Sequence, residues 1–211
     1  MVIVSKIITF LALQFVADSS LRTVKQAFKN AKLPHTLGIE FKPKALLDVV
    51  FLADTSKPPI DVIAGMAVLK NDTSTQPSFS VTFPGKRVIP PEYGSGPFVV
   101  TVLDPDAPSP QNTSWAQVRH FLAGNFYFEF GASGPQLVNK TPAVSDWKAP
   151  SPPEGSDAHK YAFLLYKQSP EFNDQTLVNS STPIKNFNIS QFAVATGLGQ
   201  PIAGTFILVA P

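Results

Sequence analysis

The sequence contains no cysteine, and this absence removes several kinds of chemistry at once. Without Cys among the 211 residues, disulfides, thiolate metal ligands and a Cys nucleophile are all excluded. The absence leaves the cellular compartment open, because exported proteins need not carry disulfides. Charge is scarce as well: charged residues make up 15% of the chain and the net charge is +2. So small a surplus predicts no nucleic-acid partner.

Proline and phenylalanine, by contrast, are abundant, with 21 and 17 copies. Many prolines between short apolar runs favour a mainly β, loop-rich body over a helical bundle. The hydrophobic share of 44% is typical of a globular protein. The length suits one domain with a sizeable core.

The N-terminus has the pattern of a secretory signal peptide. One positive side chain, Lys6, precedes the run 7–17, which is uncharged, and small and polar residues follow it. The run is too short for a membrane-spanning helix, which needs ~20 residues; the alternative is a buried N-terminal helix. We therefore predict a signal peptide over 1–19, a single domain over 20–211, and a secreted protein, either extracellular or in the secretory pathway.

Glycosylation sequons support the same prediction. Each is weak alone, because the N-x-[ST] pattern is common by chance. Together, on predicted loops behind a predicted signal peptide, they favour a glycoprotein. The candidate sites are Asn71, Asn112, Asn139, Asn179 and Asn188.

Hydrophobic periodicity predicts a helix at each end of a strand-rich chain. Ser20 is placed to cap the first helix. The residues between 131 and 155 are predicted to be loop. The predicted helices are 21–32 and 190–198, and the predicted strands are 46–52, 61–69, 77–83, 98–103, 118–128, 159–168 and 205–209.

Polar side chains stand where three of the predicted core strands begin or end. The strand 98–103 runs directly into the rigid segment 104–109, whose two prolines prevent strand continuation. Acids after one strand and histidines at the start of others are typical of groups held beside a pocket. The candidate constellation is Asp104, Asp106, His120, His159 and Tyr161.

The chemistry of this constellation leaves four interpretations open. His120, His159 and Asp104 have the composition of a 2-His-1-carboxylate metal site. Ser109 or Ser114 could act as a hydrolase nucleophile with a His base, although neither lies in a G-x-S-x-G elbow. Imidazoles, a Tyr hydroxyl and loop N–H groups can instead bind an anion. In the fourth interpretation the polar groups only satisfy loop backbone.

Three motifs in combination resemble those of the phosphatidylethanolamine-binding protein family. They are Asp-Pro-Asp-Ala-Pro-Ser at 104–109, Arg-His-Phe at 119–121, and His-Lys-Tyr at 159–161, which starts an apolar run that ends in Gln168. The resemblance covers roughly residues 46–206. It implies a body of two antiparallel β-sheets, arranged like a sandwich with a few peripheral helices, and a small anion pocket at one end.

The resemblance also implies which residues form that pocket. Asp104, His120 and His159 match the acid and the two histidines. The other candidates are Asp106, Trp115, Pro152, Pro153 and Tyr161. The Ala107–Pro108 bond is expected to be cis. Three positions, Val118, Ser151 and Asp157, depart from the family pattern, and the carboxylate of Asp157 is expected to weaken anion affinity.

The function that the resemblance implies is non-enzymatic binding of phospholipid headgroups or other small anions, such as phosphate or phosphoethanolamine. We expect the phosphate between His120 and His159, capped by N–H groups of residues 157–159, with no metal and no cofactor. A rival function is inhibition of a serine carboxypeptidase or another secreted protease. A structural surface protein with a vestigial pocket is a further alternative. We expect a monomer that makes peripheral membrane contact at most.

Overall fold

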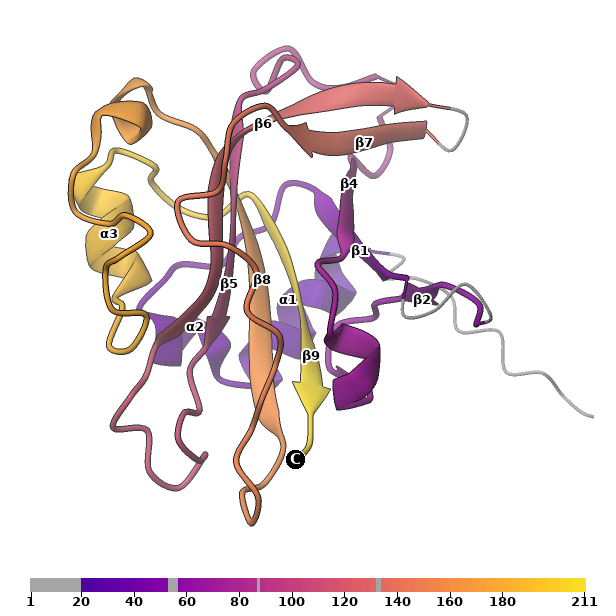
Figure 1. Ribbon diagram of the computed structural model, residues 1–211. Helices are drawn as coiled ribbons and strands as arrows, with labels where there is room; N and C mark the ends of the chain where they lie inside the picture. The colour runs from indigo at the N-terminus through magenta and orange to yellow at the C-terminus, as the bar shows by residue number, and fades with distance from the viewer. Residues whose placement is uncertain (1–19, 53–56, 87, 132–133) are drawn as a thin grey trace, which may run out of the picture.

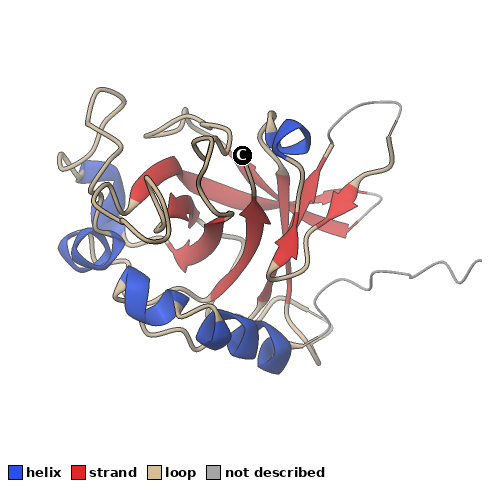
Figure 2. Ribbon diagram, turned by 90° about the horizontal axis from the view of Figure 1, so that it is seen from below, coloured by secondary structure: helices blue, strands red, loops and turns tan. Residues whose placement is uncertain are grey.

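The computed structural model describes residues 20–52, 57–86, 88–131 and 134–211. The predicted signal peptide, 1–19, lies outside these ranges. Within them, nine strands form one curled sheet, and the helices lie outside it (Figures 1 and 2). No helix in the described part of the chain has the length and apolar character needed to cross a membrane.

The helices and strands of the described residues have the following bounds. The helices are α1 (Leu21–Asn30), α2 (Leu33–Leu37) and α3 (Ile189–Ala195), with 3-10 turns at Lys70–Thr73 and Pro170–Asp174. The strands are β1 (Leu46–Phe51), β2 (Ile60–Asp61), β3 (Met66–Ala67), β4 (Ser78–Thr82), β5 (Phe98–Asp104), β6 (Val118–Gly131), β7 (Gly134–Asn139), β8 (His159–Lys167) and β9 (Ala203–Val209). Their order in the sheet is β2-β1-β4-β7-β6-β5-β8-β9-β3.

The prediction of two sheets in a sandwich is wrong, and β7 is the reason. The segment was predicted to be loop, because Gly134 and Pro135 open it and few apolar residues follow. In the structure β7 pairs along its length with β6 and also pairs with β4, through Phe79 opposite Leu137. This strand joins two groups of strands into one curled sheet. The coarser prediction, a mainly β body with a few helices, is confirmed.

Strand β5 lies between β6 and β8 and is buried along all its length. Its side chains alternate between two apolar clusters. Phe98, Val100 and Val102 belong to the cluster inside the curl, while Val99 and Leu103 belong to the one beneath the helices. A strand covered on both faces is expected to be largely apolar, which explains the apolar run in the sequence; the polar Thr101 within it donates its hydroxyl to the Phe121 carbonyl at 2.9 Å.

The strand predicted at 61–69 is instead two short strands, β2 and β3, joined by a turn at Gly65. This glycine has φ of +90°, and a Cβ there would lie 3.2 Å from the Phe206 ring. Positive φ and close approach both favour glycine. The chain can therefore leave β1, to which β2 pairs, and reach β9, to which β3 pairs in parallel.

The first helix forms as its sequence predicts. The Ser20 hydroxyl accepts a hydrogen bond from the Thr23 N–H at 3.1 Å, which satisfies one free donor of the first turn. Val24 and Phe28 are buried against the sheet, and the Phe28 ring stacks on Phe41 at a centroid distance of 3.9 Å. The basic side chains of this helix face outward.

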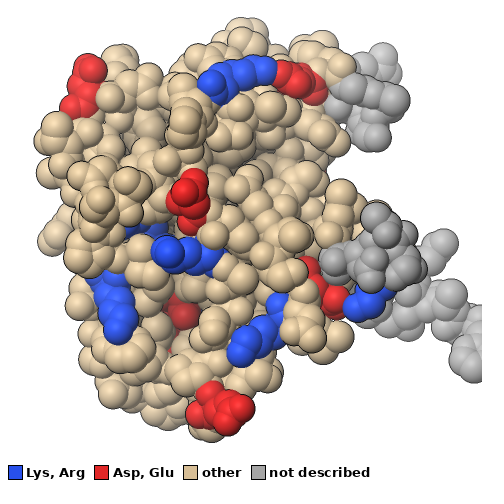
Figure 3. Space-filling model, in the orientation of Figure 1, with Lys and Arg blue, Asp and Glu red and all other residues tan. Residues whose placement is uncertain are grey.

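The surface carries few charges, and they are dispersed. On the face drawn in Figure 3, the Lys and Arg side chains stand apart from one another and do not form a continuous basic patch. Asn71, Asn112, Asn179 and Asn188 are exposed, and Asn139 is half-buried. Four of the five predicted glycosylation sites are thus on the surface of the folded chain.

The role of β7 can be tested by truncating its buried residue. Leu137→Ala is expected to lower the free energy of unfolding by about 2–4 kcal/mol, because it removes apolar contacts and leaves a cavity. Gln136→Ala, on the exposed face of the same strand, is expected to change it by less than about 0.5 kcal/mol. Urea unfolding of both variants gives the comparison; equal small effects would contradict the packing of β7 on the core.

Candidate anion-binding site

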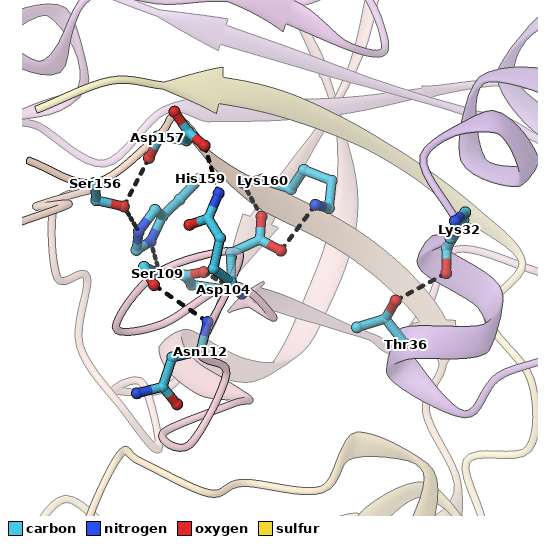
Figure 4. Close-up of polar contacts among 11 residues, drawn as sticks. Lys32, Thr36, Asp104, Ser109, Asn112, Ser156, Asp157, His159 and Lys160 are labelled. Carbon is cyan, nitrogen blue, oxygen red and sulfur yellow. Dashed lines mark hydrogen bonds and ion pairs between the residues drawn. The ribbon is translucent and has the colours of Figure 1, made fainter.

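The site begins with the antiparallel pairing of β5 and β8. Because the two strands run in opposite directions, the last residues of β5 lie beside the first residues of β8, at the same end of the sheet (Figure 1). The His159 Nδ1–H donates to Asp104 Oδ2 at 2.8 Å (Figure 4). The two residues are only 1% and 3% exposed. They form a buried acid–imidazole pair.

The second nitrogen of His159 has a partner too. Its Nε2 lies 2.9 Å from the Ser156 hydroxyl oxygen, and that hydroxyl donates its proton to the Asp157 carbonyl at 2.8 Å (Figure 4). The His159 ring is thus held at both nitrogens, by Asp104 and by Ser156, and its orientation in the site is fixed.

His120 reaches the same place from β6. Its Nδ1–H donates to the Lys148 carbonyl at 2.7 Å, and its ring packs edge-on against Tyr161 at a centroid distance of 5.0 Å. Burial lowers the pKa of His120, and the hydrogen bond to Lys148 and the charge of Asp104 only partly oppose that shift. His120 is therefore neutral at neutral pH. Its remaining nitrogen, Nε2, is the one left for a ligand.

Tyr161 contributes a hydroxyl that stays protonated. Burial, reinforced by the nearby Asp104 charge, raises the pKa of this phenol far above its ordinary value. A hydrogen bond with the backbone of Ser151 acts in the opposite direction. The neutral phenol can donate a hydrogen bond to an anion at any physiological pH.

These groups border a cavity of about 160 Å³. Six of the eight predicted binding residues line it: Asp104, Trp115, Pro153, His120, His159 and Tyr161. The other lining residues are Ala107, Pro108, Val118, Ser151, Ile184 and Lys185. The volume is below the range of about 300–1,000 Å³ that is usual for drug-sized ligands, so the cavity suits a single small polar group.

The other two predicted residues do not line the cavity. The Asp106 carboxylate accepts hydrogen bonds from the backbone N–H and the ammonium of Lys160, at 2.7 and 2.8 Å. Asp106 thus fixes the loop to β8. Pro152 is buried beside the exposed Pro153. The peptide bond between Ala107 and Pro108 is cis, as predicted.

Lys185 and Ser156 were missed by reasoning from the sequence. The Lys185 ammonium lies 3.3 Å from the centroid of the Trp115 ring, a cation–π contact at the cavity. The loop that carries Lys185 is tied to this position by the Asn186 N–H, which donates to the Trp115 carbonyl at 3.0 Å. No local motif marks Lys185, because its position depends on contacts between distant segments, whereas Ser156 lies only three residues before His159.

The hydrolase and metal interpretations find little support in the geometry. Ser109 accepts from the Asn112 N–H (Figure 4), Ser114 is exposed, and neither lines the cavity. Asp104, His159 and Ser156 follow the order of an acid–His–Ser array, but Ser156 does not line the cavity. The described residues include no group of three His, Asp or Glu side chains arranged to hold a metal ion.

The chain matches a known protein family over most of its length. Residues 54–207 match a family model described as phosphatidylethanolamine-binding protein. A Saccharomyces cerevisiae protein, "Uncharacterized protein YLR179C", is 34% identical over 106 residues, which are 50% of this chain. The chain spans about half the length of this curated relative, 48%.

Solved structures share the fold. A carboxypeptidase Y inhibitor, solved in complex with its cognate proteinase, has a TM-score of 0.69 and 20% identity, covering 94% of this chain and 97% of the inhibitor chain. A phosphatidylethanolamine-binding protein from Plasmodium vivax has a TM-score of 0.62 and 14% identity, covering 87% of this chain and 95% of that one.

The buried His120 makes stability depend on pH. Because burial lowers its pKa in the folded state, the unfolded chain takes up a proton more readily, and stability falls as the pH drops below about 6.5. His120→Gln, which keeps a donor for the Lys148 carbonyl, is expected to lose less stability than the wild type between about pH 7.5 and about pH 5. Thermal unfolding across that range measures the difference. Parallel curves for the two proteins would contradict the assignment.

Proposed function

The chain belongs to the phosphatidylethanolamine-binding protein family, and from that premise we propose that its small cavity binds the phosphate of a phospholipid headgroup or a similar small anion. The observation that carries the proposal is the convergence of His120, His159, Tyr161 and Lys185 on one cavity of about 160 Å³. All four carry hydrogen-bond donors, and Lys185 also carries a positive charge.

The donors have different parts in the proposed mechanism. The His159 ring is held by Asp104 and Ser156, so its part is to fix the Asp104 carboxylate at the cavity wall. His120 has Nε2 left for the ligand, and an anion beside it favours protonation of that nitrogen. Lys185 can exchange its contact with the Trp115 ring for a phosphate oxygen at the cavity.

Asp104 gives the cavity a preference among anions. It is hydrogen-bonded to His159, and its carboxylate lies on the wall of the cavity. A headgroup that carries an ammonium beside its phosphate can place the ammonium towards this carboxylate. We therefore propose phosphoethanolamine-type groups ahead of free phosphate.

We also propose that the protein binds without turnover and acts after export. The first point is supported by the position of Ser156, the serine beside His159, which does not line the cavity. The N-terminal sequence pattern and the exposure of Asn71, Asn112, Asn179 and Asn188 support the second. A protein of this kind needs no cofactor, because its fixed donors supply the recognition.

The headgroup proposal predicts that binding depends on Lys185 and not on Lys148. Lys185→Met is expected to weaken phosphoethanolamine binding about tenfold, because it removes one charge-assisted hydrogen bond. Lys148→Met is the matched control, since Lys148 is also exposed but its side chain does not line the cavity. Calorimetric titration in phosphate-free buffer measures both. No binding by the wild type, or equal binding by the wild type and the combined variant His120→Ala, His159→Ala, would refute the proposal.

A second candidate function is inhibition of a serine carboxypeptidase. The likeness in fold to the carboxypeptidase Y inhibitor over 94% of the chain supports it. An interface of this kind buries about 800 Å² on each partner, far more than the surface around one lysine. The two functions therefore predict different responses to Lys185→Met.

Inhibition can be tested with a panel of serine carboxypeptidases and a chromogenic peptide. The expected result is slower release of the C-terminal residue, with little change in Lys185→Met, because most of the interface lies elsewhere. A metallo-carboxypeptidase is the control, since it cleaves similar substrates without a serine nucleophile. The absence of slowing across the panel would remove this candidate.

A further inference from the structure

A second, larger cavity lies directly beside the first. Its volume is about 550 Å³, and it is bordered by α3 and by the loop that precedes that helix. Lys185 lines both cavities. We call the larger one the α3 groove; it includes Arg119, Leu177, Lys185, Phe187, Phe192 and Ala195.

The wall between the two cavities is a short segment fixed by backbone hydrogen bonds. The Arg119 N–H donates to the Ile184 carbonyl at 2.8 Å, and the Asn186 N–H donates to the Trp115 carbonyl at 3.0 Å. Held in this way, Ile184 lines the small cavity and Phe187 lines the α3 groove. A ligand that occupies both cavities must cross this wall beside Lys185.

The charge of the α3 groove is positive. Arg119 is 1% exposed; its guanidinium donates to the Ser145 hydroxyl at 2.7 Å and the Thr182 carbonyl at 3.0 Å, and lies 5.0 Å from the Phe187 ring centroid. Within the described part of the chain it has no acidic partner, and burial lowers its pKa. With Lys185 it gives a groove bordered by two cations and no acid, which favours a ligand whose phosphate lies at the Lys185 end.

The remaining surface of the groove is largely apolar. Phe187 and Phe192 are buried at its base, and Leu177 is 54% exposed at its edge. A surface of this kind gains free energy when an alkyl chain displaces water from it. Its volume lies in the range that holds small organic ligands, about 300–1,000 Å³.

From these observations we propose that the α3 groove holds the acyl chain of a single-chain phospholipid whose headgroup occupies the small cavity. The phosphate then lies beside Lys185, where the two cavities adjoin, and the chain extends past Phe187 towards α3. This inference rests on the proposed headgroup function and names the class of ligand, a lysophospholipid. The headgroup and the acyl chain are thus bound on opposite sides of the segment 184–187.

The test compares phosphoethanolamine with lysophosphatidylethanolamines that carry hexanoyl, octanoyl and decanoyl chains, each below its micelle concentration. In the wild-type protein the affinity is expected to rise about two- to fourfold for each added methylene that becomes buried. Calorimetric titration of the full chain gives each dissociation constant.

Two substitutions on α3 separate the groove from the rest of the surface. Ala195→Trp places an indole in the groove and is expected to abolish most of the gain with chain length. Val194→Trp is the matched control, because Val194 is 79% exposed and lines neither cavity. It is expected to keep the gain. Thermal unfolding of both variants verifies that each is folded.

The outcomes distinguish this inference from the function on which it rests. If phosphoethanolamine binds but affinity does not rise with chain length, or if both tryptophan variants retain the gain, the headgroup function stands and the chain site is overturned. If the lipids bind in the groove while phosphoethanolamine does not bind, the headgroup function fails, and the single-ligand proposal fails with it. A gain that Ala195→Trp alone removes supports the inference.

Discussion

The small cavity depends on the buried contact between Asp104 and His159. Asp104 and His159 are both almost fully buried, so each needs the other as a hydrogen-bond partner. Removing one partner of a buried charged pair lowers the stability of the fold by about 3–5 kcal/mol. The pair forms because β5 and β8 are antiparallel neighbours, which brings an end and a beginning of two strands together. The same carboxylate also accepts the Asp106 N–H at 2.7 Å, so it orders the loop that follows.

The elements that were predicted well are those whose burial is uniform. β5 and β8 are covered on both faces, so their central residues are mostly apolar and their positions at the centre of the sheet follow. β7 was missed because its identity as a strand depends on its neighbours β4 and β6 more than on its own residues. The expectation of two sheets came from the family resemblance, and the structure has one curled sheet that β7 completes.

The same distinction applies to the site. Asp104, His120 and His159 could be identified because each stands at a strand end within a specific motif. Lys185 could not, since its place beside Trp115 is set by hydrogen bonds between residues some seventy positions apart. Asp106 was predicted to bind the ligand because it lies in the same motif as Asp104. Its carboxylate instead accepts hydrogen bonds from Lys160, so it supports the site from outside the cavity.

The short edge strands of the sheet bear on how the protein avoids aggregation at high concentration. The outermost strands, β2 and β3, are each only two residues long. Unpaired N–H and C=O groups along a long outer strand are a template on which another chain can add, and natural proteins shorten such strands to prevent it. Outer strands this short give another chain little to pair with, which limits strand-mediated aggregation.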